Sequence, residues 1–127
     1  MEHALVKLSV PAQPAFARSV RMMAANLAVL CSMTVDEVED ARMAAEEAFV
    51  YACATHPEFC DVSFEVGDEG LKMAFSLGGP LDADDPVVAE QVGLAQVLLS
   101  AVSDFFEISP DDCLLHVTKM VGVVDAN

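Results

Sequence analysis

The longest helical pattern in the chain runs from Thr34 to His56, with the sequence TVDEVEDARMAAEEAFVYACATH. Thr34 and Glu37 form the T-x-x-E signature of a capping box, which predicts the start of the helix, and Pro57 predicts its end. Because most side chains on its apolar face are alanines, that face is slim enough to lie flat on a sheet. The face repeats at helical spacing through Val38, Ala41, Ala45, Ala48, Phe49 and Ala52.

Two further segments have helical periodicity. A first helix opens near Pro14, carries one apolar side and ends around Cys31 and Ser32. Only a short turn separates it from Thr34, so we expect the first two helices to pack as neighbours. A third helix is predicted over residues 87–103, with Gly93 in its first half. The apolar side of the first helix comprises Phe16, Val20, Met23, Leu27 and Leu30.

Three segments alternate apolar and polar residues, which is typical of half-buried strands, and two further strands are expected near the C-terminus. Pro11 follows the first of these segments and favours an edge position for it. The residues from Gly67 to Gly70 predict a hairpin turn. The resulting order, β-α-α-β-β-α-β-β, predicts an α+β two-layer sandwich, in which three helices cover one face of a mixed, mostly antiparallel sheet. The strands are expected over residues 4–10, 60–66, 71–77, 105–110 and 113–121.

Composition limits the choice of class and partner. A length of 127 residues with 54% hydrophobic residues predicts a single domain, 1–127, around one core. The net charge is −15 with only six Lys and Arg, so nucleic-acid binding is not expected. Two interpretations of this charge stay open, an acidic solvated surface and a basic protein partner. No apolar run reaches the roughly 18–20 residues of a membrane span, and the N-terminus lacks a signal-peptide pattern, so we expect a cytoplasmic protein without membrane contact.

The four cysteines, Cys31, Cys53, Cys60 and Cys113, form no C-x-x-C pair. We expect them to be buried, reduced thiols. Cys53, His56 and Cys60 lie close together in sequence, which leaves a metal site as an alternative. Their spacing matches no common zinc pattern, so we predict no metal site.

Two segments, VPAQPAFARSVRMM and EDARMAAEEAFVYA, are followed by a hairpin, a glycine-containing loop and a glycine-containing helix. This order is similar to that of the anti-sigma-factor serine/threonine kinases, small bacterial proteins with the histidine-kinase-like ATPase fold. The resemblance covers nearly the whole chain. It implies this fold, an Mg-ATP site made from three short motifs, protein partners in transcription control, and pairing of the domain with itself.

The first family motif, Glu-Ala-x-x-Asn, implies that Glu47 is the catalytic general base. Tyr51 stands where the family has the Asn that holds Mg²⁺. A phenol is a bulky, poor ligand for an ion that prefers small hard oxygens in a tight octahedral shell. An alternative interpretation makes Glu47 one more acid on an acidic helix, paired with Arg18 or Arg42.

The other two motifs depart further from the family pattern. In Asp-x-Gly the Asp accepts a hydrogen bond from adenine, but here Leu77 replaces it and Gly79 holds the last position. In the glycine-rich turn that approaches the phosphates, Gly93 is kept and Ala95 takes the place of a second glycine. The connection over residues 80–92 is short and acidic, whereas an ATP lid carries donors for phosphate.

We therefore expect an anti-sigma-factor-like regulator that binds a sigma factor or an anti-sigma antagonist, forms a homodimer, and has a degenerate nucleotide site without a cofactor. The alternative is an active Mg-ATP-dependent kinase of an anti-sigma antagonist, supported by Glu47 and Gly93. A third hypothesis is a small-molecule sensor that uses the former nucleotide pocket.

Overall fold

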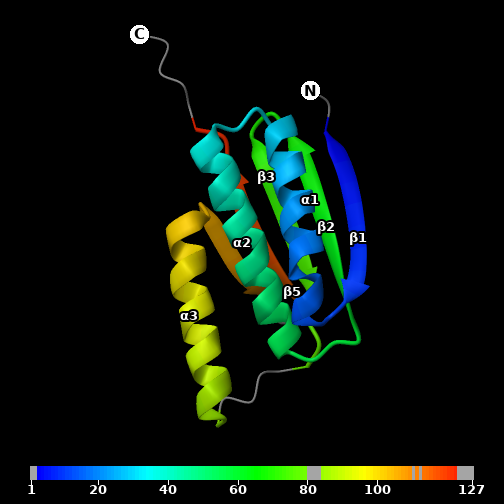
Figure 1. The fold of residues 1–127 in the computed structure, drawn as a ribbon, viewed down its shortest axis with the longest axis vertical. Helices are drawn as coiled ribbons and strands as arrows, with labels where there is room; N and C mark the ends of the chain where they lie inside the picture. Colours follow the sequence, from blue (N-terminus) through cyan, green and yellow to red (C-terminus); the bar gives the residue numbers. More distant parts are fainter. Residues whose placement is uncertain (1–2, 80–83, 110, 112, 123–127) are drawn as a thin grey trace.

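A computed structural model describes residues 3–79, 84–109, 111 and 113–122 of the chain. The element order is the one that the sequence pattern predicts (Figure 1). Residues 80–83 of the acidic connection over residues 80–92 lie outside the described residues, and so does residue 110 at the end of the fourth expected strand. The elements are β1 (Ala4–Pro11), the 3₁₀ helix η1 (Pro14–Phe16), α1 (Ala17–Leu30), α2 (Val35–Ala54), β2 (Phe59–Gly67), β3 (Gly70–Ser76), α3 (Pro86–Val102), β4 (Phe105–Ser109) and β5 (Leu114–Met120).

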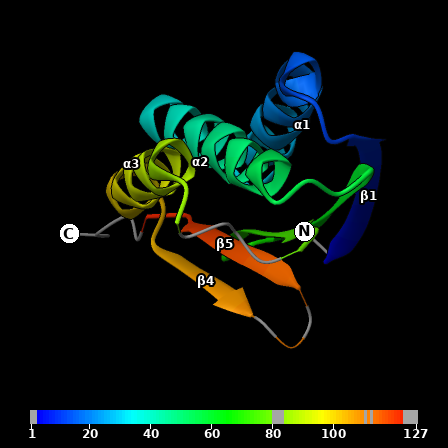
Figure 2. The ribbon, with the colours of Figure 1, turned by 90° about the horizontal axis from the view of Figure 1, so that it is seen from below.

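The five strands form one sheet in the order β1-β2-β3-β5-β4, and every neighbouring pair is antiparallel. The three helices lie side by side over one face of this sheet, with α2 in the middle (Figures 1 and 2). The two-layer α+β prediction is therefore confirmed, and β1 lies at an edge of the sheet as Pro11 indicated.

Alternation along the strands sorts side chains between the two faces of the sheet. One cross-strand row packs under the helices and consists of Val6, Phe64, Met73, Val117 and Phe106. The adjacent row lies on the uncovered face and consists of Leu5, Glu65, Lys72, Thr118 and Phe105. The uncovered face thus mixes charged, polar and apolar groups.

Helix α2 begins as predicted, because the Thr34 hydroxyl accepts the Glu37 amide and the Glu37 carboxylate accepts the Thr34 amide. It ends at Ala54 rather than at His56. His56 adopts a φ of 57°, a left-handed conformation that a right-handed helix cannot contain. Five alanines of α2 are completely buried: Ala41, Ala44, Ala45, Ala48 and Ala52.

The hairpin between β2 and β3 depends on Gly70, which has a φ of 149°. A Cβ at this position would lie 2.3 Å from the Lys119 carbonyl oxygen of the neighbouring strand β5. Both the backbone conformation and the close contact therefore require glycine here. The predicted turn from Gly67 to Gly70 is confirmed by the pairing of these two residues.

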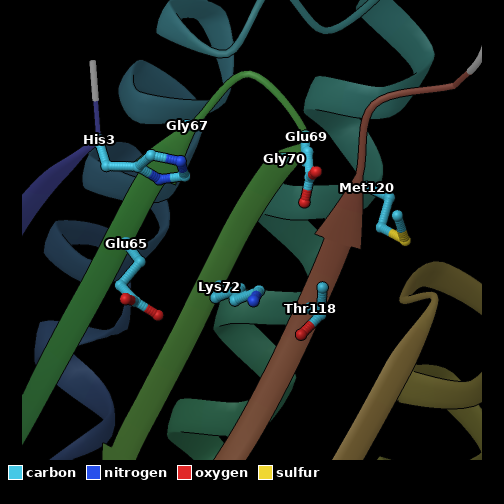
Figure 3. A pocket seen from close by; sticks show the side chains of 8 residues that line it. All are labelled: His3, Glu65, Gly67, Glu69, Gly70, Lys72, Thr118 and Met120. Atoms are coloured by element: carbon cyan, nitrogen blue, oxygen red, sulfur yellow. The ribbon is translucent and has the colours of Figure 1, made fainter. Parts of the chain in front are cut away.

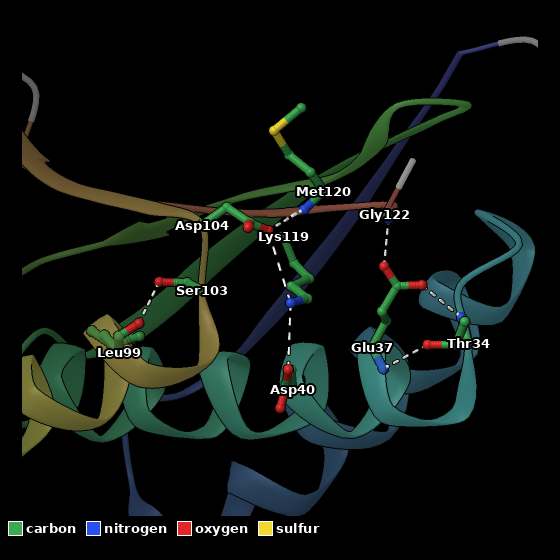
Figure 4. Close-up of polar contacts among 9 residues, drawn as sticks. All are labelled: Thr34, Glu37, Asp40, Leu99, Ser103, Asp104, Lys119, Met120 and Gly122. Carbon is green, nitrogen blue, oxygen red and sulfur yellow. Dashed lines mark hydrogen bonds and ion pairs between the residues drawn. The ribbon is translucent and has the colours of Figure 1, made fainter. Parts of the chain in front are cut away.

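A group of polar contacts joins the first half of α2 to the end of β5 (Figure 4). Lys119 lies on the helix-facing side of the sheet, 3.4 Å from the Asp40 carboxylate and 3.9 Å from the Asp104 carboxylate. The Glu37 carboxylate accepts the Gly122 amide in addition to its cap contact. The hydrogen bonds from the Thr34 and Gly122 amides hold the pKa of Glu37 below its usual value.

We predict that Glu37→Gln lowers the free energy of unfolding at pH 7, because it removes a charged acceptor from both contacts. A lowered carboxyl pKa contributes stability above the unfolded pKa and loses it as the pH falls through the folded pKa. The difference between wild type and variant should therefore shrink below about pH 4.3. Urea unfolding at a series of pH values measures it. Asp36→Asn, which removes a charge from the same helical turn, is the matched control, and an equal loss there would contradict the prediction.

Candidate functional site

The six predicted nucleotide-site positions come from three elements. Glu47 and Tyr51 belong to α2, Leu77 and Gly79 follow β3, and Gly93 and Ala95 belong to α3. Helices α2 and α3 lie beside each other in both views (Figures 1 and 2). The Gly79 amide donates to the Thr55 carbonyl at the end of α2, at 3.0 Å. The fold therefore brings the three elements together, but the side chains differ in burial and contacts.

Glu47 is half-buried on α2. Its neighbour Glu46 bonds Arg21 of α1 at 2.9 Å, so Glu47, about 100° further round the helix, lies on the flank turned away from α1. Burial raises the pKa of Glu47, and the charge of Glu46 raises it further. The alternative pairing of Glu47 with Arg18 or Arg42 is not among the ion pairs of the described residues, and Arg42 bonds the Glu39 carboxylate at 2.6 Å.

Tyr51, Leu77 and Ala95 belong to the packing of the core. Tyr51 is 6% exposed and Ala95 is 2% exposed, and both are members of the main hydrophobic cluster. Leu77 is partly buried against the same cluster. Burial also raises the pKa of the Tyr51 phenol, which favours its neutral form. Half of the predicted nucleotide-site positions are thus occupied by core side chains.

Thr55 lies at the turn between α2 and the end of β3, although no motif in the sequence indicated it. Its buried hydroxyl donates to the Ala52 carbonyl at 2.6 Å and accepts the Gly78 amide at 2.7 Å. A Cβ at Gly78 would lie 2.2 Å from the Thr55 carbonyl oxygen, so Gly78 and not Gly79 is the glycine that this turn requires. Thr55 follows Ala52 by three residues and so falls on the apolar face of the helix. A hydroxyl on an apolar face was the sequence feature that could have indicated its buried contacts.

The cysteines have different surroundings. Cys31 and Cys60 are buried as expected, and burial raises the pKa of the Cys60 thiol to about 11. Cys53 is partly buried, whereas Cys113 is exposed, so the prediction of burial is wrong for Cys113. Cys113 lies just before β5, in a left-handed conformation with a φ of 53°. Within the described part of the chain, His, Cys, Asp and Glu side chains form no group of three that could hold a metal ion.

Among the described residues, hollows of about 300, 580 and 610 Å³ lie on the uncovered face of the sheet. The smallest of these three lies at the β2–β3 hairpin, where His3, Glu65, Glu69 and Lys72 surround it (Figure 3). The His3 ring lies against Gly67, since a Cβ there would be 2.6 Å from it. None of the six predicted positions lines any of these three hollows. No pattern in the sequence indicated this face as a site.

No family model matches this chain, and no curated protein matches it. The relationship to the anti-sigma-factor kinases therefore stays a prediction. Among the helices of the described residues, none has the length and apolar character needed to cross a membrane.

The effect of a Gly93 substitution on stability tests whether the fold requires glycine at this position. It lies exposed within α3, and a Cβ added there meets nothing within 4 Å. Because alanine favours a helix interior by about 1 kcal/mol over glycine, we predict that Gly93→Ala raises the free energy of unfolding by up to about that amount. Urea denaturation measures it. Gly78→Ala is the matched control, and its expected effect has the opposite sign because of the contact with Thr55.

Glu47 allows a prediction with pH. Because its pKa is raised, the folded state favours the neutral carboxyl. The neutral carboxyl contributes folding stability below the unfolded pKa, and this stability is lost as the pH rises through the folded pKa. Glu47→Gln should therefore raise the melting temperature at pH 7, and this gain should vanish below about pH 4. Glu46→Gln, which loses the ion pair with Arg21, is the control without such a gain. A loss of stability in Glu47→Gln at pH 7 would contradict this account.

Proposed function

We propose that this chain is an anti-sigma-factor-like regulator of bacterial transcription, which acts by binding another protein. In this proposal it has the histidine-kinase-like ATPase architecture with a nucleotide site that no longer suits Mg-ATP. The element order and the two-layer arrangement support the architecture. One observation supports the proposed loss of the nucleotide site: Tyr51, Leu77 and Ala95 pack with the hydrophobic core.

The metal and adenine contacts are the first to be lost. A buried phenol with a raised pKa keeps its proton, and Mg²⁺ selects small hard oxygens, so Tyr51 is a poor replacement for an asparagine ligand. Leu77 has no oxygen to accept a hydrogen bond from the adenine amino group. An unpaired buried polar group costs about 1–3 kcal/mol, so the two losses together weaken binding by orders of magnitude.

The phosphate contacts are opposed by charge. Residues 73–118 contain no Lys or Arg, and every charged side chain among them is acidic. At the start of α3 the Asp85 carboxylate accepts the Val87 amide, so a carboxylate already occupies the end of the helix where a phosphate would bind. A triphosphate would meet negative charge without a neighbouring cation from this part of the chain.

The partner is, in this proposal, a sigma factor or an anti-sigma antagonist in the cytoplasm. A net charge of −15 favours a partner with basic surface and disfavours nucleic acid. We also propose a homodimer, with the uncovered sheet face as its contact surface. That face carries half-buried or exposed apolar side chains, Leu5, Leu114 and Phe105, together with Lys7 and Lys72.

An active kinase is the second candidate, and Glu47 favours it. This carboxyl is half-buried, has a raised pKa, and makes no hydrogen bond or ion pair with another described residue. A raised pKa brings a carboxylate closer to the strength that a general base needs near neutral pH. Transfer of the γ-phosphate of ATP to a serine of a partner, lost in Glu47→Gln, would establish this function instead.

We predict that isothermal titration of the protein with Mg-ATP shows no binding at micromolar concentration, because three of the nucleotide positions are packed and the surrounding charge is acidic. A cooperative thermal transition in the same buffer is the control for folding. A micromolar Kd that disappears in EDTA would overturn the proposal.

In a pull-down from the native cell, a sigma factor or its antagonist should be retained, and its absence would contradict the assigned partner.

A further inference from the structure

Helix α3 carries large apolar side chains on a face that no other described element covers. Val87, Leu94 and Val97 are 62%, 60% and 66% exposed. The opposite side of the same helix supplies Ala95 and Leu99 to the core. Figures 1 and 2 show α3 at the edge of the helical layer, with α2 on one side only. A helix that is apolar on two sides is typical of a helix with two packing partners.

The exposed side chains follow the spacing of a helix–helix contact. Val87, Leu94 and Ala101 are seven residues apart, and Val97 follows Leu94 by three. Positions at this spacing lie in one line along a helix and match the seam through which amphipathic helices pack. We call Val87, Leu94, Val97 and Ala101 the α3 seam. Glu90, three residues after Val87, falls in the same line.

Charge restricts what can cover the α3 seam. Glu90 is the only charged residue of α3, and residues 73–118 contain acidic side chains but no Lys or Arg. A partner that covers the α3 seam also covers the Glu90 carboxylate, and a buried carboxylate needs a cation beside it. That cation has to come from outside residues 73–118. A second copy of α3 would bring more carboxylates and none of the required cations. A basic partner supplies both the cation and a favourable long-range attraction to a chain of net charge −15.

We propose that the α3 seam docks an amphipathic helix of a basic partner protein. The apolar stripe of that helix covers Leu94 and Val97, and its Lys or Arg side chains lie beside Glu90 and near Asp85 at the start of α3. This inference specifies the chemistry and location of the partner contact in the proposed function, and rests on that function for the partner's biological role.

The probe is a fluorescein-labelled synthetic peptide of leucine and lysine, arranged in a seven-residue repeat so that it forms one apolar and one basic face. Fluorescence anisotropy measures its affinity for the full chain at about 0.15 M salt, where distant charges are largely screened. A scrambled peptide of the same composition tests whether the apolar stripe is needed. We expect the patterned peptide to bind at least about tenfold more tightly than the scrambled one.

Leu94→Asp is the decisive variant. It removes an apolar contact from the centre of the α3 seam and adds a negative charge, so seam docking predicts a loss of about tenfold or more. Non-specific attraction of a basic peptide to an acidic protein predicts the opposite, a gain. The matched control is Met22→Asp in α1, where the side chain is 58% exposed. Glu90→Lys should also weaken binding, because it places a like charge against the basic face.

Equal affinities of Leu94→Asp and Met22→Asp, or of the patterned and scrambled peptides, would overturn the inference. So would a wild-type dimer in sedimentation that Leu94→Asp dissociates, since a second copy would then cover the seam. Micromolar Mg-ATP binding would remove the proposed function and leave the peptide result standing. Failure of the peptide experiment without ATP binding would remove this inference alone.

Discussion

The close packing of helix α2 on the sheet is the contact on which the rest of the structure depends. Five completely buried alanines form the contact face, and their small side chains let the helix backbone approach the strands. Alanine loses no side-chain entropy when it is buried, so this contact is formed at low entropic cost. Because α2 also contacts both α1 and α3, its position determines where the other two helices lie.

This packing also involves the positions that the family resemblance assigns to a nucleotide site. Tyr51 of α2 and Ala95 of α3 are both part of the hydrophobic core, and Leu77 packs against the same cluster. Glu47 lies nearer the surface on that helix, and its carboxyl retains partial exposure and a raised pKa. Three of the positions that the resemblance assigns to a nucleotide are therefore filled by side chains that pack with the core.

Two surfaces of the molecule differ in the chemistry that they offer to a partner. The uncovered face of the sheet mixes Lys7 and Lys72 with carboxylates and exposed apolar groups, so it suits a self-complementary contact. The α3 seam is apolar and lies in a part of the chain whose charged side chains are all acidic. We propose that the first surface pairs like copies and that the second binds a partner of opposite charge.

The sequence by itself determined the features that depend only on residues close together in the chain. The capping box at Thr34, the helical spacing of the alanines and the alternation of the strands each concern residues within a few positions of one another. Tertiary structure alone decided the strand order, the burial of the Thr55 hydroxyl against Gly78, and the placement of Lys119 between Asp40 and Asp104. These contacts join residues far apart in the chain, and no local pattern specifies which distant partner a side chain will meet.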